Sequence, residues 1–193
     1  MTGIGHNRGP ALSGGLGWQK HCWSKARAEL LPTLPIEVIR TRLKRAKELG
    51  LDYKAYASVR AKTGHDIVAL LFSTNALRVL RAGQDLPEEQ HRKLKDLVGC
   101  ERLLAVSSPL VPLEVKSRIE AQGIDITTAI AAPTIAQNYG QTRDALRAAL
   151  TPNKLPGDKV VVIGDTMLEA TWADTARLGA YIPSETYFAG APL

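Results

Sequence analysis

The feature that most constrains the fold is a run of four β-branched residues, Val160 to Ile163, that leads directly into Gly164-Asp165-Thr166. A short apolar run that ends in a polar turn is typical of a strand buried on both faces of a sheet. Strands of that kind occur where helices cover both faces. The run therefore predicts an α/β protein that is built on a mostly parallel sheet.

The surrounding sequence alternates between short apolar runs and helical patterns. Strands are expected at 103–107, 124–130 and 160–163, and helices from 86 onward and at 113–121, 142–150 and 167–178. Strands that alternate with helices favour a parallel sheet with flanking helices. Residues 85–193 are therefore predicted to form a small Rossmann-like α/β domain.

The front of the chain has a different character. Residues 1–17 are rich in glycine and lack periodicity, which predicts a flexible N-terminal segment, and residues 18–84 are expected to form a basic helical region. Within that region, Pro35 and Gly50 bound one helix, and Asp52 and Gly64 bound the next.

A third helix is expected at 66–82, because its apolar residues recur at intervals of three to four positions. Its apolar side could pair two copies of the chain as a homodimer. Residues 34–82 would then form a compact three-helix unit.

Charge is distributed unevenly along the chain. Residues 1–62 contain 12 Lys and Arg against 4 Asp and Glu, whereas residues 63–193 contain 13 against 15. A basic surface of this kind attracts phosphate through counterion release, although an ordinary solvated face remains an alternative. The predicted nucleic-acid-binding residues are Arg40, Lys44, Arg45, Lys47, Lys54, Arg60 and Lys62.

Two predicted strands end in polar turns. Ligands of open α/β sheets bind at the carboxyl ends of the strands, so both turns are expected at the mouth of one site. The expected ligand-binding residues are Ser107, Ser108, Gly164, Asp165 and Thr166.

These strand ends resemble the haloacid dehalogenase-like hydrolase superfamily over about the C-terminal half of the chain. By that resemblance, Ser107 would bind a phosphoryl oxygen, Asp165 and Glu169 would hold Mg²⁺, and Lys154 or Lys159 would match the family lysine. The family also needs an Asp-x-Asp nucleophile motif, which occurs nowhere in this sequence. The nearest apolar segment that ends in polar residues, 70–75, offers a hydroxyl and an amide instead, so no aspartyl-phosphate can form.

Three functions remain open at this point. The leading hypothesis is a nucleic-acid-binding or regulatory protein whose α/β domain binds a ligand or partner. The alternatives are a Mg²⁺-dependent phosphate-handling enzyme or small-molecule sensor, and a protein-interaction module. No apolar run approaches the ~20 residues that cross a bilayer, and the distant Cys22 and Cys100 are expected to be reduced thiols of a cytoplasmic protein.

Overall fold

The computed structural model describes residues 34–189, and the chain divides into two compact units, residues 1–39 and 40–193. The helices of eight or more residues are α2 (Ile36–Glu48), α3 (Tyr53–Thr63), α4 (Glu88–Lys95), α5 (Pro112–Ala121) and α6 (Tyr139–Leu150). The shorter helices are η1 (Thr151–Asn153), η2 (Gly157–Lys159), α7 (Met167–Ala170), α8 (Trp172–Ala176) and α9 (Ser184–Phe188). The strands are β1 (Ala69–Ser73), β2 (Glu101–Val106), β3 (Thr128–Ala131), β4 (Val160–Gly164) and β5 (Ala180–Pro183).

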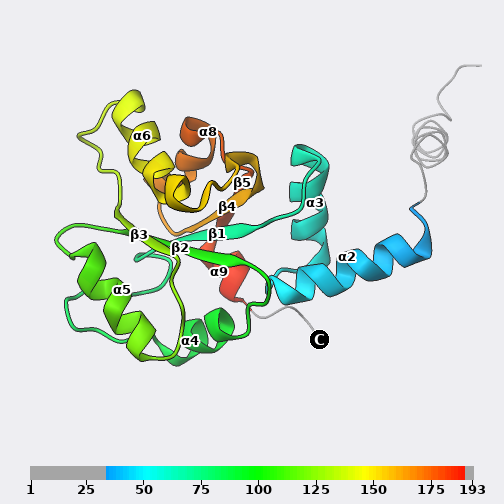
Figure 1. Ribbon diagram of the computed structural model, residues 1–193, viewed down its shortest axis with the longest axis horizontal. Helices are drawn as coiled ribbons and strands as arrows, with labels where there is room; N and C mark the ends of the chain where they lie inside the picture. Colours follow the sequence, from blue (N-terminus) through cyan, green and yellow to red (C-terminus); the bar gives the residue numbers. More distant parts are fainter. Residues whose placement is uncertain (1–33, 190–193) are drawn as a thin grey trace, which may run out of the picture. The chain divides into compact units, whose positions relative to one another are not determined.

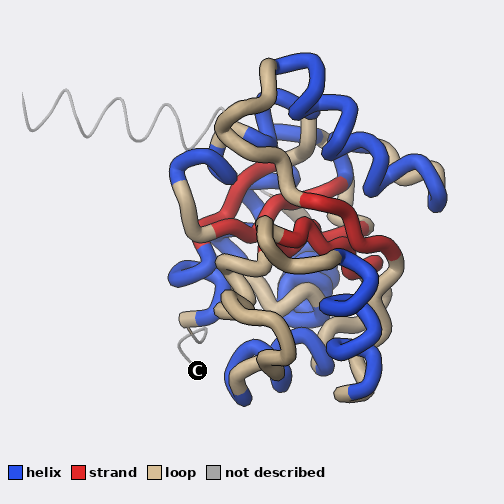
Figure 2. The backbone as a smooth tube through the Cα atoms, turned by 90° about the vertical axis from the view of Figure 1, so that its left-hand side faces the viewer, coloured by secondary structure: helices blue, strands red, loops and turns tan. Residues whose placement is uncertain are grey.

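The five strands form one parallel sheet in the order β3-β2-β1-β4-β5. Strand β1 is central, and its Leu71 lies opposite Leu103 of β2 and Val162 of β4. Figure 2 shows the strands as a layer between helices. The fold is therefore a Rossmann-like α/β arrangement, as the alternating sequence pattern predicts.

The two faces of the sheet bury different side chains. Leu70 and Phe72 of β1 join one core cluster, which includes residues of α3, α4, α5 and α9, whereas Ala69 and Leu71 join a second cluster with α6 and α8. Figure 1 shows α6 and α8 on one side of the sheet and α4, α5 and α9 on the other. Every residue of β1 and β4 is buried, which explains why both strands read as continuous apolar runs.

The prediction of a third helix at 66–82 is wrong. The apolar residues at 67, 70, 71 and 77 fit a helical spacing, but residues 69–73 form the central strand β1. Both faces of β1 are buried, so its sequence lacks the alternation of apolar and polar residues that usually identifies a strand. The three-helix unit and the apolar helix face proposed for a homodimer therefore do not exist. The expected boundary after residue 84 also fails, because β1 pairs with β2 and β4 beyond it.

The two preceding helices follow their predicted signals. Asp52 caps α3 by accepting a hydrogen bond from the backbone of Ala55 (2.7 Å), and Gly64 ends the helix in the left-handed region at φ +75°. Gly50 ends the turn after α2 at φ +64°. These caps explain the boundaries of both helices.

The remaining elements differ in detail from the expected ones. The strand expected at 124–130 is shorter and is shifted to β3, and the helix expected at 167–178 is two short helices, α7 and α8. Strand β5 and helix α9 were not predicted, and the segment 1–17 lies outside the described residues. Within residues 34–189, no helix is both long and apolar enough to span a membrane.

Candidate functional site

The carboxyl ends of β2, β1 and β4 lie side by side because these strands are neighbours in the sheet. Ser107 follows β2, Asn75 follows β1 and Asp165 follows β4. The structure thus brings the expected residues of the second and fourth strands to one edge of the sheet. It adds residues 73–75, which fall within the helix that the spacing predicts at 66–82.

Asn75 connects all three strand ends. Its Nδ2 donates a hydrogen bond to Glu169 Oε1 at 2.8 Å and lies 3.4 Å from Ser107 Oγ. A neutral amide therefore stands between a hydroxyl and a carboxylate.

Glu169 is buried, with 1% of its surface exposed, and its carboxylate is held by three N–H donors. Oε2 accepts hydrogen bonds from the backbone of Asp165 (2.6 Å) and Thr166 (2.9 Å), and Oε1 accepts the Asn75 amide. The Thr166 hydroxyl accepts the Glu169 backbone N–H in return, which completes a capping box at the start of α7. This carboxylate is therefore satisfied within the fold.

Gly164 permits this arrangement. A Cβ atom at this position would lie 2.9 Å from Glu169 Cβ and 2.7 Å from a ring carbon of Tyr181. Burial raises the pKa of Tyr181, and the neighbouring charges of Glu169 and Asp165 raise it further. Gly164, one of the predicted ligand-binding residues, therefore has a packing role: because it has no side chain, Glu169 and Tyr181 can lie against its backbone.

Asp165 is held by two side chains, Ser184 and Arg78, that no motif of the sequence indicates. Its Oδ1 accepts the hydroxyl of Ser184 at 2.5 Å, and its Oδ2 lies 3.1 Å from Nη1 of Arg78. The Arg78 side chain is 54% exposed, so it places a cation at the surface of the cluster. Arg78 follows the end of β1. The sequence marks that end with an apolar run followed by Ser73-Thr74-Asn75.

The other strand-end hydroxyls have separate roles. Ser73 and Thr74 are buried: the Ser73 hydroxyl accepts the backbone N–H of Ala76, and the Thr74 hydroxyl accepts that of Ser107 at 3.0 Å. Ser108 is exposed. Thr166 is exposed as well, and its hydroxyl accepts the backbone N–H of Glu169. A ligand could therefore reach the hydroxyls of Ser107, Ser108 and Thr166.

The residues of this cluster do not fit a magnesium site. Mg²⁺ prefers an octahedral shell with carboxylate oxygens, but three N–H donors already occupy Glu169, and Arg78 neutralises Asp165. Asn75 stands where the family resemblance requires a carboxylate. Within residues 34–189, no group of three or more His, Cys, Asp or Glu side chains could hold a metal ion.

Lys154 and Lys159 do not reach this cluster. Lys154 ends η1 and Lys159 ends η2, and both precede the first residue of β4. They lie at the amino edge of the sheet, opposite Asp165. The expected family lysine is therefore not supplied by either residue.

Three of the seven predicted nucleic-acid-binding cations lie within ion-pair distance of a carboxylate: Lys44, Arg45 and Arg60. Arg45 contacts Asp66 (2.9 Å) and Glu48 (3.1 Å), and its guanidinium also donates to the carbonyls of Ile67 and Gly99. Burial alone would lower the pKa of Arg45, but these carboxylates outweigh it and hold the pKa above its ordinary value. Arg45 thus ties α2 to the residues that precede β1 and β2.

Arg60 also approaches Asp66, at 3.9 Å, and the hydroxyl of Tyr56 donates to the same carboxylate at 2.8 Å. Tyr56 is buried in the core; burial, followed by the hydrogen bond to Asp66, raises its pKa. Lys44 is exposed, as are the other predicted cations: Arg40, Lys47, Lys54 and Lys62.

Cys100 is a free cysteine, and burial raises the pKa of its thiol to about 12. Its thiol therefore stays protonated at neutral pH, in keeping with a reduced, unreactive cysteine. Cys22 lies outside the described residues.

The sheet order and the side chains at its carboxyl edge define a Rossmann-like α/β protein with a polar strand-end cluster. No family model and no curated protein matches the chain. Two solved structures are similar to it. A hypothetical protein from Xanthomonas campestris shares 16% identity, with 64% of this chain and 65% of that chain covered and a TM-score of 0.42. An uncharacterised protein from Corynebacterium glutamicum shares 14% identity, with 66% of this chain and 98% of that one covered and a TM-score of 0.45.

Proposed function

We propose that the α/β domain is a non-catalytic binding domain of haloacid dehalogenase-like type, which takes a small anionic ligand at the carboxyl edge of the sheet without a metal ion. The observation that carries this proposal is the Asn75 amide, which donates to the buried Glu169 beside Ser107. In a metal-dependent hydrolase of this type, a carboxylate would stand there and a cation would offset the charge. Here an amide stabilises Glu169 directly.

The ligand class follows from Arg78 and the adjacent hydroxyls. A guanidinium presents its N–H donors in one plane, which suits carboxylate and phosphate oxygens. Asp165 orients Arg78 at 3.1 Å while the side chain stays more than half exposed. Ser107 and the exposed Ser108 add hydroxyls near the same strand end, so a phosphate or carboxylate group is the expected ligand.

Thermal melting in phosphate tests this function. Inorganic phosphate should raise the melting temperature of the wild-type protein, and it should do so equally with Mg²⁺ or with EDTA. Arg78→Gln should lose most of that increase, because it removes the charged donors. Arg81→Gln, an exposed arginine three residues further along the same loop, is the matched control.

Two outcomes would reject the binding domain. One is a melting temperature that rises only when Mg²⁺ and phosphate are present together. The other is an equal loss of the phosphate effect in Arg78→Gln and Arg81→Gln, which would indicate a general charge effect.

Nucleic-acid binding by α2 and α3 is the second candidate function. It is favoured by the exposed lysines on these helices, of which Lys44 is 81% exposed and 4.0 Å from Glu48. Exposed lysines contact phosphates as mobile point charges, and each contact adds to the salt dependence of binding. Arg45 and Arg60 are excluded from this surface, because Asp66 engages both.

Charge reversal tests this candidate. Lys44→Glu, Lys47→Glu and Lys54→Glu together should weaken binding to duplex DNA or RNA at least tenfold at low salt, measured by fluorescence anisotropy. The control is Arg92→Glu with Lys95→Glu, two exposed cations on α4. Equal loss in both variants, or no binding by the wild-type protein, would eliminate nucleic acid as the partner.

A further inference from the structure

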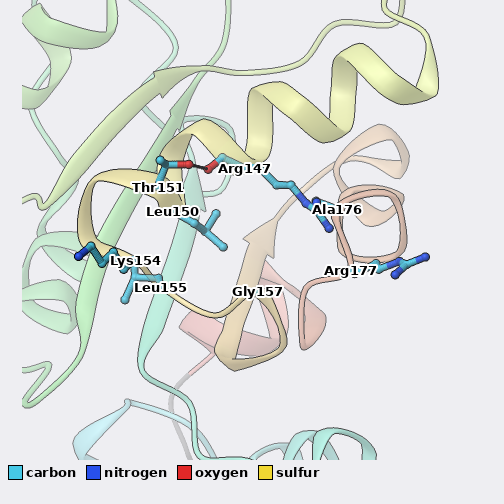
Figure 3. A pocket seen from close by; sticks show the side chains of 8 residues that line it. All are labelled: Arg147, Leu150, Thr151, Lys154, Leu155, Gly157, Ala176 and Arg177. Atoms are coloured by element: carbon cyan, nitrogen blue, oxygen red, sulfur yellow. Dashed lines mark hydrogen bonds between the residues drawn. The ribbon is translucent and has the colours of Figure 1, made fainter.

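A second candidate site lies at the opposite edge of the sheet. A pocket of about 270 Å³ opens where α6 and α8 end, beside the loop that leads into β4 (Figure 3). It is separate from the Asn75 cluster, because its residues precede β4 and β5 instead of following them. The lining residues are Arg147, Leu150, Thr151, Lys154, Leu155, Gly157, Ala176 and Arg177.

The lining is strongly positive. Arg147, Lys154 and Arg177 are cations, and no carboxylate belongs to the lining. In the part of the chain that the structure describes, none of the three forms an ion pair. Asp158 and Asp174 are close in sequence but are not part of the lining. Three uncompensated cations around one pocket create a local potential that attracts anions.

Two of these cations occupy unfavourable backbone positions. Lys154 has φ +52° and Arg177 has φ +56°, in the left-handed region where glycine or asparagine is usual. Strain of this kind persists where the surrounding structure imposes it, and it is frequent at binding sites. The cations are therefore held at the ends of η1 and α8, where folding alone would favour glycine.

The loop beneath the pocket is closely packed. A Cβ atom on Gly157 would lie 2.9 Å from the carbonyl oxygen of Arg177, so only glycine fits between the loop and the end of α8. Leu150 and Ala176 are buried in the core and form part of the apolar lining of the pocket. Figure 3 shows Arg147 extending toward Ala176, with Lys154 and Arg177 on opposite sides and their charged ends directed outward.

We propose that this amino-edge pocket binds the phosphoryl or pyrophosphoryl group of a small molecule, with Arg147, Lys154 and Arg177 as its anchoring cations. Arg147 already extends across the pocket, and the exposed side chains of Lys154 and Arg177 would turn from their outward directions toward a bound anion. The two arginines then offer planar donors for phosphate oxygens, and the lysine supplies a point charge. The proposal does not depend on the function proposed for the carboxyl edge.

Calorimetric titration with inorganic pyrophosphate at low ionic strength tests the pocket. The wild-type full-length protein should bind it, and Lys154→Gly combined with Arg177→Gly should weaken binding at least tenfold. The same variant should melt at an equal or higher temperature than the wild-type protein, because glycine relieves the left-handed backbone. Loss of binding therefore cannot be assigned to unfolding.

The controls separate this pocket from other cations. Arg143 lies on α6 outside the pocket, and Arg92 is an exposed cation on α4; Arg143→Gln and Arg92→Gln should both bind pyrophosphate as the wild-type protein does. Equal weakening by Arg143→Gln, or unchanged binding by the double glycine variant, would overturn the proposal. Absence of pyrophosphate binding, with duplex DNA binding lost in the double glycine variant, would assign the pocket to nucleic acid and reject the small-molecule ligand.

Discussion

Asn75 illustrates how one uncharged side chain changes the chemistry available at a strand end. Its amide gives Glu169 a third hydrogen bond, so that a buried negative charge needs no metal. The sequence has an amide where the family resemblance expects a carboxylate, but it does not show which group the amide contacts. That contact spans 94 positions of the chain and depends on the sheet order.

Replacing this amide by a carboxylate should destabilise the protein. Asn75→Asp puts two carboxyl groups within contact distance and removes a hydrogen bond from a buried charge, which costs about 3 kcal/mol in the free energy of unfolding. In the variant, the two adjacent negative charges raise the pKa at which this pair of carboxyl groups takes up a proton. The loss of stability should therefore be largest above that pKa, and it should shrink as the pH falls and one of the two carboxyl groups is protonated. Urea denaturation between pH 4 and pH 8 measures both effects.

Magnesium distinguishes this explanation from general damage to the fold. Mg²⁺ should restore part of the stability of Asn75→Asp and leave the wild-type protein unchanged. Asn138→Asp is the matched control, because a carboxylate can accept the same cap hydrogen bond from Gln141. If Asn75→Asp were as stable as Asn138→Asp at neutral pH, the role assigned to the amide would be wrong.

Arg45 shows a limit of reading charge from sequence. It belongs to the same run of cations as Lys44 and Lys47, yet its side chain turns inward to Asp66. A count of cations cannot distinguish an arginine that joins two segments of the fold from one that faces solvent. Only the position of the partner, 21 residues away, makes the difference.

Among the elements, helices with explicit caps were predictable and the central strand was not. Asp52 and Gly64 bound α3 by local hydrogen bonding and backbone geometry, which the neighbouring residues determine. Strand β1 is determined by its partners β2 and β4, which lie further along the chain. Its apolar residues fitted a helical spacing equally well, and burial on both faces removed the usual alternation.

The cap of α3 can be measured directly. Asp52→Ala removes the acceptor of the Ala55 backbone N–H and should lower the free energy of unfolding by about 1 kcal/mol. Ser58→Ala, an exposed position in the middle of the same helix, should change stability by only a few tenths of that amount. Chemical denaturation of both variants gives the comparison, and equal effects would show that the cap contributes nothing specific.

At the scale of the whole molecule, alternation of strands and helices was sufficient to predict the parallel sheet. The strand order β3-β2-β1-β4-β5 could not be predicted, because the sequence pattern does not reveal its central strand β1. The expected division at residue 84 failed for the same reason. Basic helices and the sheet therefore share one core cluster, in which Leu49 and Tyr56 pack with Phe72.

The central position of β1 has a consequence for synthesis. The chain emerges from the ribosome in order, so β1 is made first among the strands and acquires one neighbour when β2 follows. Its other flank faces no partner until β4 has been translated, about ninety residues later. Nascent chains that stop before that point would present an unpaired apolar strand edge, which is a template for aggregation.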